Sequence, residues 1–76
     1  MKGLVEYVVG NLVDDAGEVD VHLEREGEID VYEVEVPEDE VGRIIGRQGR
    51  TVNAIRTLVG ASASKTGQRT QVEILD

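Results

Sequence analysis

Apolar side chains near the start of the chain occur in adjacent pairs that recur every four residues. Helical geometry places residues three and four apart on one face, so this spacing predicts an amphipathic helix over residues 2–14. The stripe consists of Leu4, Val5, Val8, Val9, Leu12 and Val13. Asp14-Asp15-Ala16-Gly17 then predicts a helix stop and a turn. Because valine is a mediocre helix former, this helix needs a sheet to pack against.

From Val19 the hydrophobic period changes to two. Val19, Val21 and Leu23 alternate with polar residues, which predicts a half-buried strand. The turn after it is predicted at Glu26-Gly27-Glu28. Acidic residues occupy the outer positions, so we expect a sheet with one wet, negatively charged face.

A second strand is predicted from the alternation of Tyr32, Val34 and Val36 with acidic residues. Ile29 and Val31 are out of phase with that set. This mismatch predicts a bulge or a loose hairpin end.

The second half of the chain predicts two helices and a last strand. Acidic residues after Pro37 suit the positive end of a helix dipole, and Gly46 ends this helix after roughly two turns. A third helix begins after Gly49, continues through Ala61-Ser62-Ala63 and ends near Gly67; its apolar face consists of Val52, Ile55, Leu58 and Val59. Residues 71–75 form a short strand. The order is helix, strand, strand, helix, helix, strand, an α+β fold.

Length and composition predict one domain over residues 1–76, with one small core built from 13 Val, 5 Leu and 5 Ile. No cysteine is present, so neither a disulfide framework nor a Cys-based zinc site can support it. The first residues lack the pattern of a signal peptide, and no apolar run approaches the ~20 residues that cross a bilayer. We therefore expect a cytoplasmic protein with no membrane association.

The net charge of −8 is unevenly distributed along the chain. Residues 1–40 contain 14 Asp or Glu against Lys2 and Arg25, a balance of −12. Residues 41–72 contain six basic residues and no acid, a balance of +6. This segregation predicts a dipolar molecule with a basic working face and an acidic back, although a solvated surface of uneven charge is the alternative.

The acid-free segment centres on Gly46-Arg47-Gln48-Gly49, which joins the two predicted helices. Glycines at both ends permit positive φ and let a ligand approach the main chain without meeting a Cβ. Free N–H groups at the start of the following helix favour an anion, and Arg47 and Arg50 can each make two hydrogen bonds to a phosphate. These properties predict a clamp on a sugar–phosphate backbone. The alternative is a tight helix–helix turn without a ligand.

The segment from Val41 to Arg50 resembles the signature of the KH domain, in which an I-G-x-x-G core follows a helix and precedes basic residues. The order of elements resembles the type II, bacterial arrangement. Length and the opening residues are similar to those of the small bacterial single-KH-domain proteins of the KhpA type. The implied fold has two layers, with three helices covering one face of a three-stranded sheet.

The resemblance implies recognition of about four unpaired RNA nucleotides in a groove beside the loop. Residues carried over to this role are Arg43, Ile44, Ile45, Gly46, Arg47, Gln48, Gly49, Arg50, Thr51, Lys65 and Arg69. One of the two isoleucines is expected to line the groove, and the other to pack inward. The implied role is that of a small RNA chaperone or post-transcriptional regulator that pairs with itself or with a second KH-containing protein.

Other functional classes find little support in the sequence. Gly42, Gly46 and Gly49 do not have the spacing of a dinucleotide or P-loop motif, so no cofactor or small-molecule substrate is expected. The carboxylates lack a paired base, nucleophile or metal cluster, so we expect neither an enzyme nor a metal site. His22 and Arg56 are compatible with plain surface positions. A protein-interaction or dimerisation module with little direct RNA binding is the alternative function.

Overall fold

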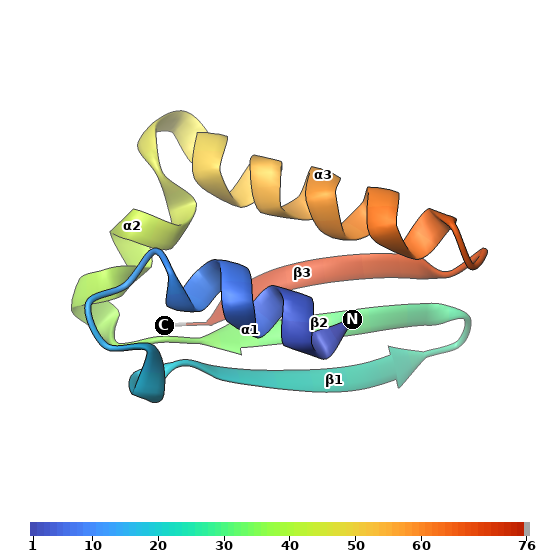
Figure 1. The fold of residues 1–76 in the computed structure, drawn as a ribbon, viewed down its shortest axis with the longest axis horizontal. Helices are drawn as coiled ribbons and strands as arrows, with labels where there is room; N and C mark the ends of the chain where they lie inside the picture. The colour runs from blue at the N-terminus through green and yellow to red at the C-terminus, as the bar shows by residue number, and fades with distance from the viewer. Residues whose placement is uncertain (76) are drawn as a thin grey trace.

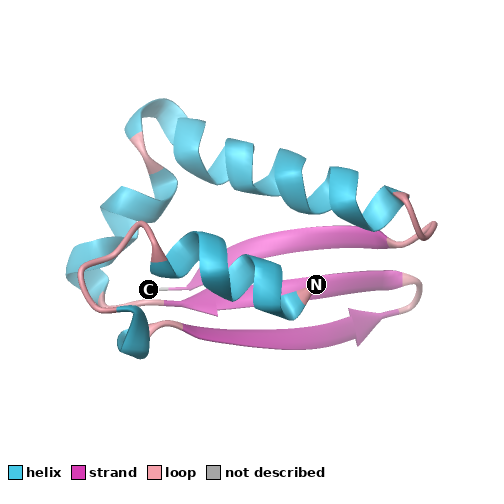
Figure 2. Cartoon of the chain, in the orientation of Figure 1, coloured by secondary structure: helices cyan, strands magenta, loops and turns pink. Residues whose placement is uncertain are grey.

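In the computed structural model, which describes residues 1–75, the elements follow the predicted α+β order (Figure 1). The helices are α1 (Lys2–Gly10), α2 (Val41–Ile45) and α3 (Arg50–Ser64). The strands are β1 (Asp20–Glu26), β2 (Ile29–Glu35) and β3 (Arg69–Leu75). Short 3-10 turns occupy Ala16–Glu18, Glu38–Glu40 and Arg47–Gly49 (Figure 2).

The three strands form one mixed sheet in the order β1-β2-β3. β1 and β2 are antiparallel and form a hairpin, whereas β2 and β3 are parallel. The parallel connection requires a crossover, which α2 and α3 supply. β3 is therefore an edge strand that runs beside the long helix α3 (Figure 1).

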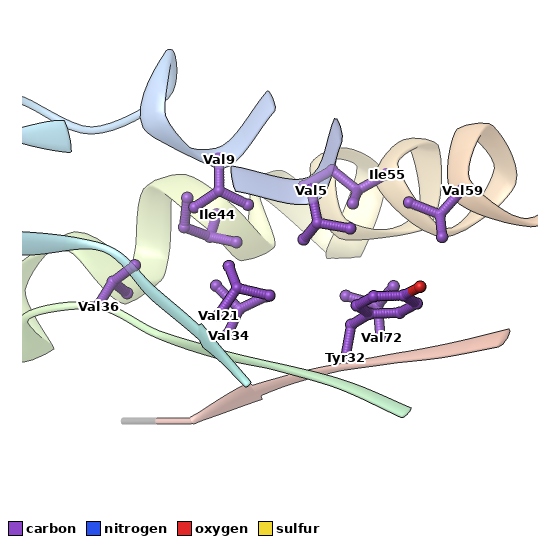
Figure 3. Packing of buried hydrophobic residues seen from close by; sticks show 10 residues of the cluster. All are labelled: Val5, Val9, Val21, Tyr32, Val34, Val36, Ile44, Ile55, Val59 and Val72. Atoms are coloured by element: carbon purple, nitrogen blue, oxygen red, sulfur yellow. The ribbon is translucent and has the colours of Figure 1, made fainter. Parts of the chain in front are cut away.

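All three helices contribute to a single core on one face of the sheet. Side chains from the helices point toward side chains from the strands, and the two sets meet in the middle (Figure 3). The cluster consists of Val5 and Val9 from α1, Ile44 from α2, Ile55 and Val59 from α3, and Val21, Tyr32, Val34, Val36 and Val72 from the strands or their ends. This confirms the predicted two-layer arrangement.

The predicted bulge in the second strand is wrong. β1 and β2 pair in unbroken register from Asp20 opposite Glu35 to Glu26 opposite Ile29. Ile29 and Val31 are out of phase because they lie on the other face of a regular strand. Val31 is nevertheless only 3% exposed, because it sits on the central strand between the side chains of its neighbours.

Several apolar residues lie outside the core that the sequence pattern assigned to them. α1 ends at Gly10 rather than near residue 14. Leu23 and Leu58 are 46% and 44% exposed, and Tyr7, which is not part of the predicted stripe, is 72% exposed. On α3, the buried seam is instead Val52, Ile55, Val59 and Ala63. Where two apolar residues are adjacent on a helix, only one can point at a sheet, and the helix orientation decides which.

Candidate functional site

The turn between α2 and α3 requires glycine at its first position. Gly46 has φ 76° and ψ 171°, and its N–H donates a hydrogen bond to the Gly42 carbonyl at 2.9 Å. A Cβ at Gly46 would overlap the Thr51 hydroxyl and lie only 2.7 Å from the Thr51 Cβ. The end of α2 is therefore pressed directly against the first turn of α3.

The next residues continue the turn in left-handed backbone conformations. Gln48 has φ 56° and Gly49 has φ 75°. Within residues 1–75, Gln48 is the only residue other than glycine with a positive φ. This conformation costs roughly 1–2 kcal/mol for a residue with a Cβ. Its side chain is exposed and makes no hydrogen bond to another described residue, so local packing does not explain its presence.

The amino end of α3 is open to an anion. No side chain caps it, and its first turn contains no acidic residue. The first backbone N–H groups of a helix lack intrahelical partners and carry the positive end of its dipole. Here the Arg50 N–H donates to the Arg47 carbonyl of the preceding 3-10 turn. Arg47 and Arg50 flank this end with exposed side chains, and no carboxylate within residues 1–75 forms an ion pair with either. Backbone donors and two exposed guanidinium groups thus lie at the same end of α3.

Arg43, another predicted contact, is already engaged by carboxylates. Its Nη1 donates a hydrogen bond to Asp14 Oδ1 at 2.7 Å and lies 3.7 Å from Glu40 Oε2. The hydrogen bond to Asp14 raises the pKa of Arg43 above its ordinary value. Glu40 Oε2 is buried without a hydrogen-bond partner among the described residues, so the nearby guanidinium supplies its compensating charge. Arg43 ties the loop after α1 to α2.

The two isoleucines differ in burial, and the inward packing that the resemblance implies for one of them falls to Ile44. Ile44 is fully buried in the core, whereas Ile45 is partly exposed. Of the two, only Ile45 can contact a ligand without a rearrangement of the core. Thr51 is partly exposed and packs beside Gly46.

Lys65 and Arg69 lie at the opposite end of α3 from the glycine turn (Figure 1). α3 contains 15 residues, which separates its ends by about 22 Å. Both side chains are exposed. Strand alternation places Arg69 on the sheet face away from the helices, because Val72 faces the core. The structure therefore does not bring these two residues together with Arg47 and Arg50.

A groove runs between α3 and the edge of β3. Its volume is about 340 Å³, and its lining residues are Arg56, Thr70, Gln71, Val72 and Glu73. Arg56 spans it and donates from Nε and Nη2 to the Val72 carbonyl at 3.2 and 3.1 Å. Its Nη1 lies 3.4 Å from Asn53 Oδ1. Arg56 lies six residues beyond Arg50, about 1.7 helical turns, so a strand held at the amino end of α3 can continue into the groove.

The residues of this groove were not predicted as site residues. Arg56 resembles a plain surface charge in the sequence, and its contact with Val72 joins segments 16 residues apart. The one feature of the sequence that could have predicted this groove is the position of the last strand. A parallel edge strand next to a long helix leaves main-chain groups unpaired along its outer side.

Other kinds of site find no support in the described part of the chain. Across residues 1–75, His, Cys, Asp and Glu form no group of three that could hold a metal ion. None of the helices over the same residues has both the length and the apolar content to cross a membrane.

Comparison with known proteins identifies the family. The KhpA/KhpB KH-domain family matches residues 2–74. The chain belongs to this family. Among curated relatives, the RNA-binding protein KhpA of Borreliella burgdorferi is 47% identical over 96% of this chain and 89% of its own length. KhpA of Halalkalibacterium halodurans is 40% identical over the whole of both chains, and KhpA of Chlamydia pneumoniae is 38% identical over 100% and 97%.

A solved structure supports the same fold. An Aquifex aeolicus Era variant matches with a TM-score of 0.71 over 96% of this chain and 28% of its own, at 16% identity. At that identity the likeness concerns the fold alone. Together with the mixed sheet and the helix order, the KhpA/KhpB match identifies a type II KH domain.

Proposed function

We propose that this protein binds single-stranded RNA without catalysis, and that residues 46–49 clamp the sugar–phosphate backbone. The observation that carries the proposal is the geometry of the amino end of α3. Uncapped backbone N–H groups lie next to Arg47 and Arg50, which have no ion-pair partner within residues 1–75. The names of the KhpA relatives support RNA as the ligand.

The bases would lie in the groove between α3 and β3, next to the clamp. Ile45, at the end of α2, supplies a partly exposed apolar surface beside the turn, and Arg56 supplies a hydrogen-bond donor in the groove. No aromatic side chain lines the groove, because Tyr32 is in the core and Tyr7 is on α1. Base stacking on aromatic rings contributes ~1–3 kcal/mol per base in other single-strand binders. Without it, we expect modest affinity.

The double variant Arg47→Asp/Gln48→Asp tests the clamp. Both side chains are exposed, and aspartate tolerates the left-handed conformation of position 48 better than most residues. The fold should therefore persist, as circular dichroism can verify. Two new carboxylates at the phosphate site should reduce affinity for a short oligouridine by more than about 100-fold, measured by fluorescence anisotropy.

A matched control separates the local effect from net charge. Lys2→Asp/Asn11→Asp changes the charge by the same amount on exposed positions of α1 and its end. This control should retain most of the affinity. Equal losses in both variants, or unchanged binding in the first, would sink the clamp hypothesis.

The biological role that fits such a module is that of a small cytoplasmic RNA chaperone or post-transcriptional regulator. A weak clamp without a catalytic group holds RNA transiently and releases it unchanged. Crosslinking to RNA in cells, followed by sequencing of the bound fragments, tests this role. Recovery of no RNA above background would contradict it.

Pairing with a second KH domain is a further candidate function, and it is compatible with RNA binding. Tyr7 on α1 and Leu58 on α3 remain exposed although both helices cover the same sheet face. A second copy of the chain, or another KH-containing protein, would bury them. Light scattering should therefore report a dimer that Tyr7→Lys/Leu58→Lys dissociates. A wild-type monomer at high concentration would exclude self-pairing.

A further inference from the structure

The sheet face away from the helices is strongly acidic. Val21, Tyr32, Val34 and Val72 face the core, so strand alternation places their neighbours on the open face. Six carboxylates occupy that face together with His22 and Arg69: Asp20, Glu24, Glu26, Glu33, Glu35 and Glu73.

Two pairs of these carboxylates are direct cross-strand neighbours. Asp20 lies opposite Glu35, and Glu33 lies opposite Glu73. Like charges in such positions destabilise a sheet. None of these four carboxylates forms an ion pair within residues 1–75. Fold stability therefore gives no reason for the arrangement, which suggests a role in what the sheet faces.

Glu73 connects this acidic face to the groove. It lines the groove from the β3 side, whereas Arg56 projects into it from α3. Arg47 and Arg50 lie further along the α3 side, at the turn. The electrostatic potential thus changes sign across β3, from basic along α3 to acidic on the open face of the sheet.

This change of sign has different consequences for one RNA strand and for two. A single strand can keep its phosphates at the amino end of α3 and direct its bases toward β3. A paired strand adds a second backbone on the far side of those bases. That second backbone would lie over the rim of the sheet, where Glu73 and Glu33 repel its phosphates.

We propose that Glu73, backed by Glu33, is the specificity-determining residue that makes the groove select single-stranded over paired RNA. The inference rests on the proposed clamp, because it requires that phosphates are held on the α3 side. The acidic face acts by exclusion and itself takes no ligand.

The test is the double variant Glu33→Gln/Glu73→Gln, with two RNA probes measured by fluorescence anisotropy at low salt. One probe is an oligouridine. It is longer than the stretch of about four nucleotides that a KH domain clamps. The other is a blunt RNA duplex of roughly one helical turn. A unit charge about 6 Å away in water changes affinity about threefold, so the two substitutions should raise duplex affinity about tenfold. Oligouridine affinity should rise less than about threefold.

A control variant, Glu6→Gln/Glu18→Gln, removes the same charge from exposed positions outside the sheet. It should leave the ratio of duplex to oligouridine affinity unchanged. An equal rise for both probes, or the same change of ratio in the control, would show a net-charge effect and overturn the proposal. A wild-type protein that binds oligouridine, with duplex affinity unmoved by Glu33→Gln/Glu73→Gln, overturns this inference alone. A wild-type protein that binds neither probe overturns the clamp as well.

Discussion

The two ends of α3 contain the same kinds of residue but present different backbone groups: N–H donors at the amino end and carbonyl acceptors at the carboxyl end. At the amino end, left-handed Gly49 lies between Arg47 and Arg50. At the carboxyl end, left-handed Gly67 lies between Lys65 and Arg69. In the sequence, both ends are glycine turns flanked by basic side chains, and the resemblance to the KH domain implies an RNA contact at both.

The backbone groups at the carboxyl end are used internally. The N–H groups of Thr66 and Gln68 both donate to the Ala63 carbonyl, at 3.0 and 3.1 Å, and that of Gly67 donates to the Ser64 carbonyl at 3.1 Å. This arrangement satisfies the last carbonyls of the helix. At the amino end, the Gly49 N–H donates to the Gly46 carbonyl at 3.2 Å and the Arg50 N–H donates to the Arg47 carbonyl, but no side chain caps the helix.

The sign of the helix dipole also differs between the ends. The positive amino end attracts phosphate, whereas the negative carboxyl end attracts cations and repels phosphate. Lys65, which follows the last residue of α3, therefore has a structural reason to be basic. Arg50 has none, because it begins the helix at the positive end. Basic residues alone thus do not distinguish the two ends of α3; the direction of the helix dipole does.

The largest expected difference between the ends concerns glycine replacement. Gly46→Ala places a Cβ against Thr51 in a backbone region that is essentially restricted to glycine. We expect a loss of about 4 kcal/mol in the free energy of unfolding, measured by urea denaturation. At Gly67 a Cβ would meet nothing within 4 Å, so Gly67→Ala should cost only the left-handed conformation, about 1–2 kcal/mol.

Gly60→Ala supplies the control for these two variants. Gly60 is inside α3, and an added Cβ would have open space. Alanine is the better helix former there by about 1 kcal/mol, so this variant should be more stable than the wild type. Similar losses for Gly46→Ala and Gly67→Ala would contradict the crowding of the first turn.

A smaller difference is expected in the salt dependence of RNA binding. With about three phosphates neutralised, log K against log[salt] should slope roughly −2, at ~0.7 per contact for single strands. Arg47→Ala/Arg50→Ala should reduce the magnitude of this slope by about 1.4 and weaken binding at low salt.

Lys65→Ala/Arg69→Ala removes the same charge from the other end and should leave the slope nearly unchanged. Titrations over a series of salt concentrations measure both values. A comparable reduction in the second variant would place RNA along the whole length of α3, in contact with Lys65 and Arg69.

Local patterns were sufficient to predict most of the fold. The change of hydrophobic period from four to two, the stop at Gly46 and the restart after Gly49 all coincide with observed boundaries to within a few residues. These features depend on neighbouring residues only. The bulge was wrong because alternation alone cannot tell a shifted strand from a regular strand whose residue on the open face, Val31, is also buried.

Contacts between distant segments could not be predicted in this way. Arg43 pairs with Asp14, 29 residues earlier, and Arg56 spans to the carbonyl of Val72. No periodic pattern encodes such pairs, because they depend on how the layers pack. Glu73 likewise has no assigned role in the sequence, and only the sheet order places it at the groove. The glycine turn was therefore accessible from the sequence, whereas the residues that line the groove were not.

The smallest expected effect is a pair of stability changes of opposite sign at the ends of α3. Arg50→Gln removes a positive charge from the positive end of the dipole, so stability should rise by about 0.5 kcal/mol at low salt. Lys65→Gln removes a favourable charge from the negative end and should lower stability by a similar amount. Thermal unfolding at low and high salt can resolve the two, because screening should shrink both changes. If wild-type Arg50 lowers stability whereas Lys65 raises it, then Arg50 serves RNA binding and Lys65 serves folding. If Arg50→Gln instead destabilised the protein, Arg50 would have a structural partner, and its assignment to the clamp would lose its main support.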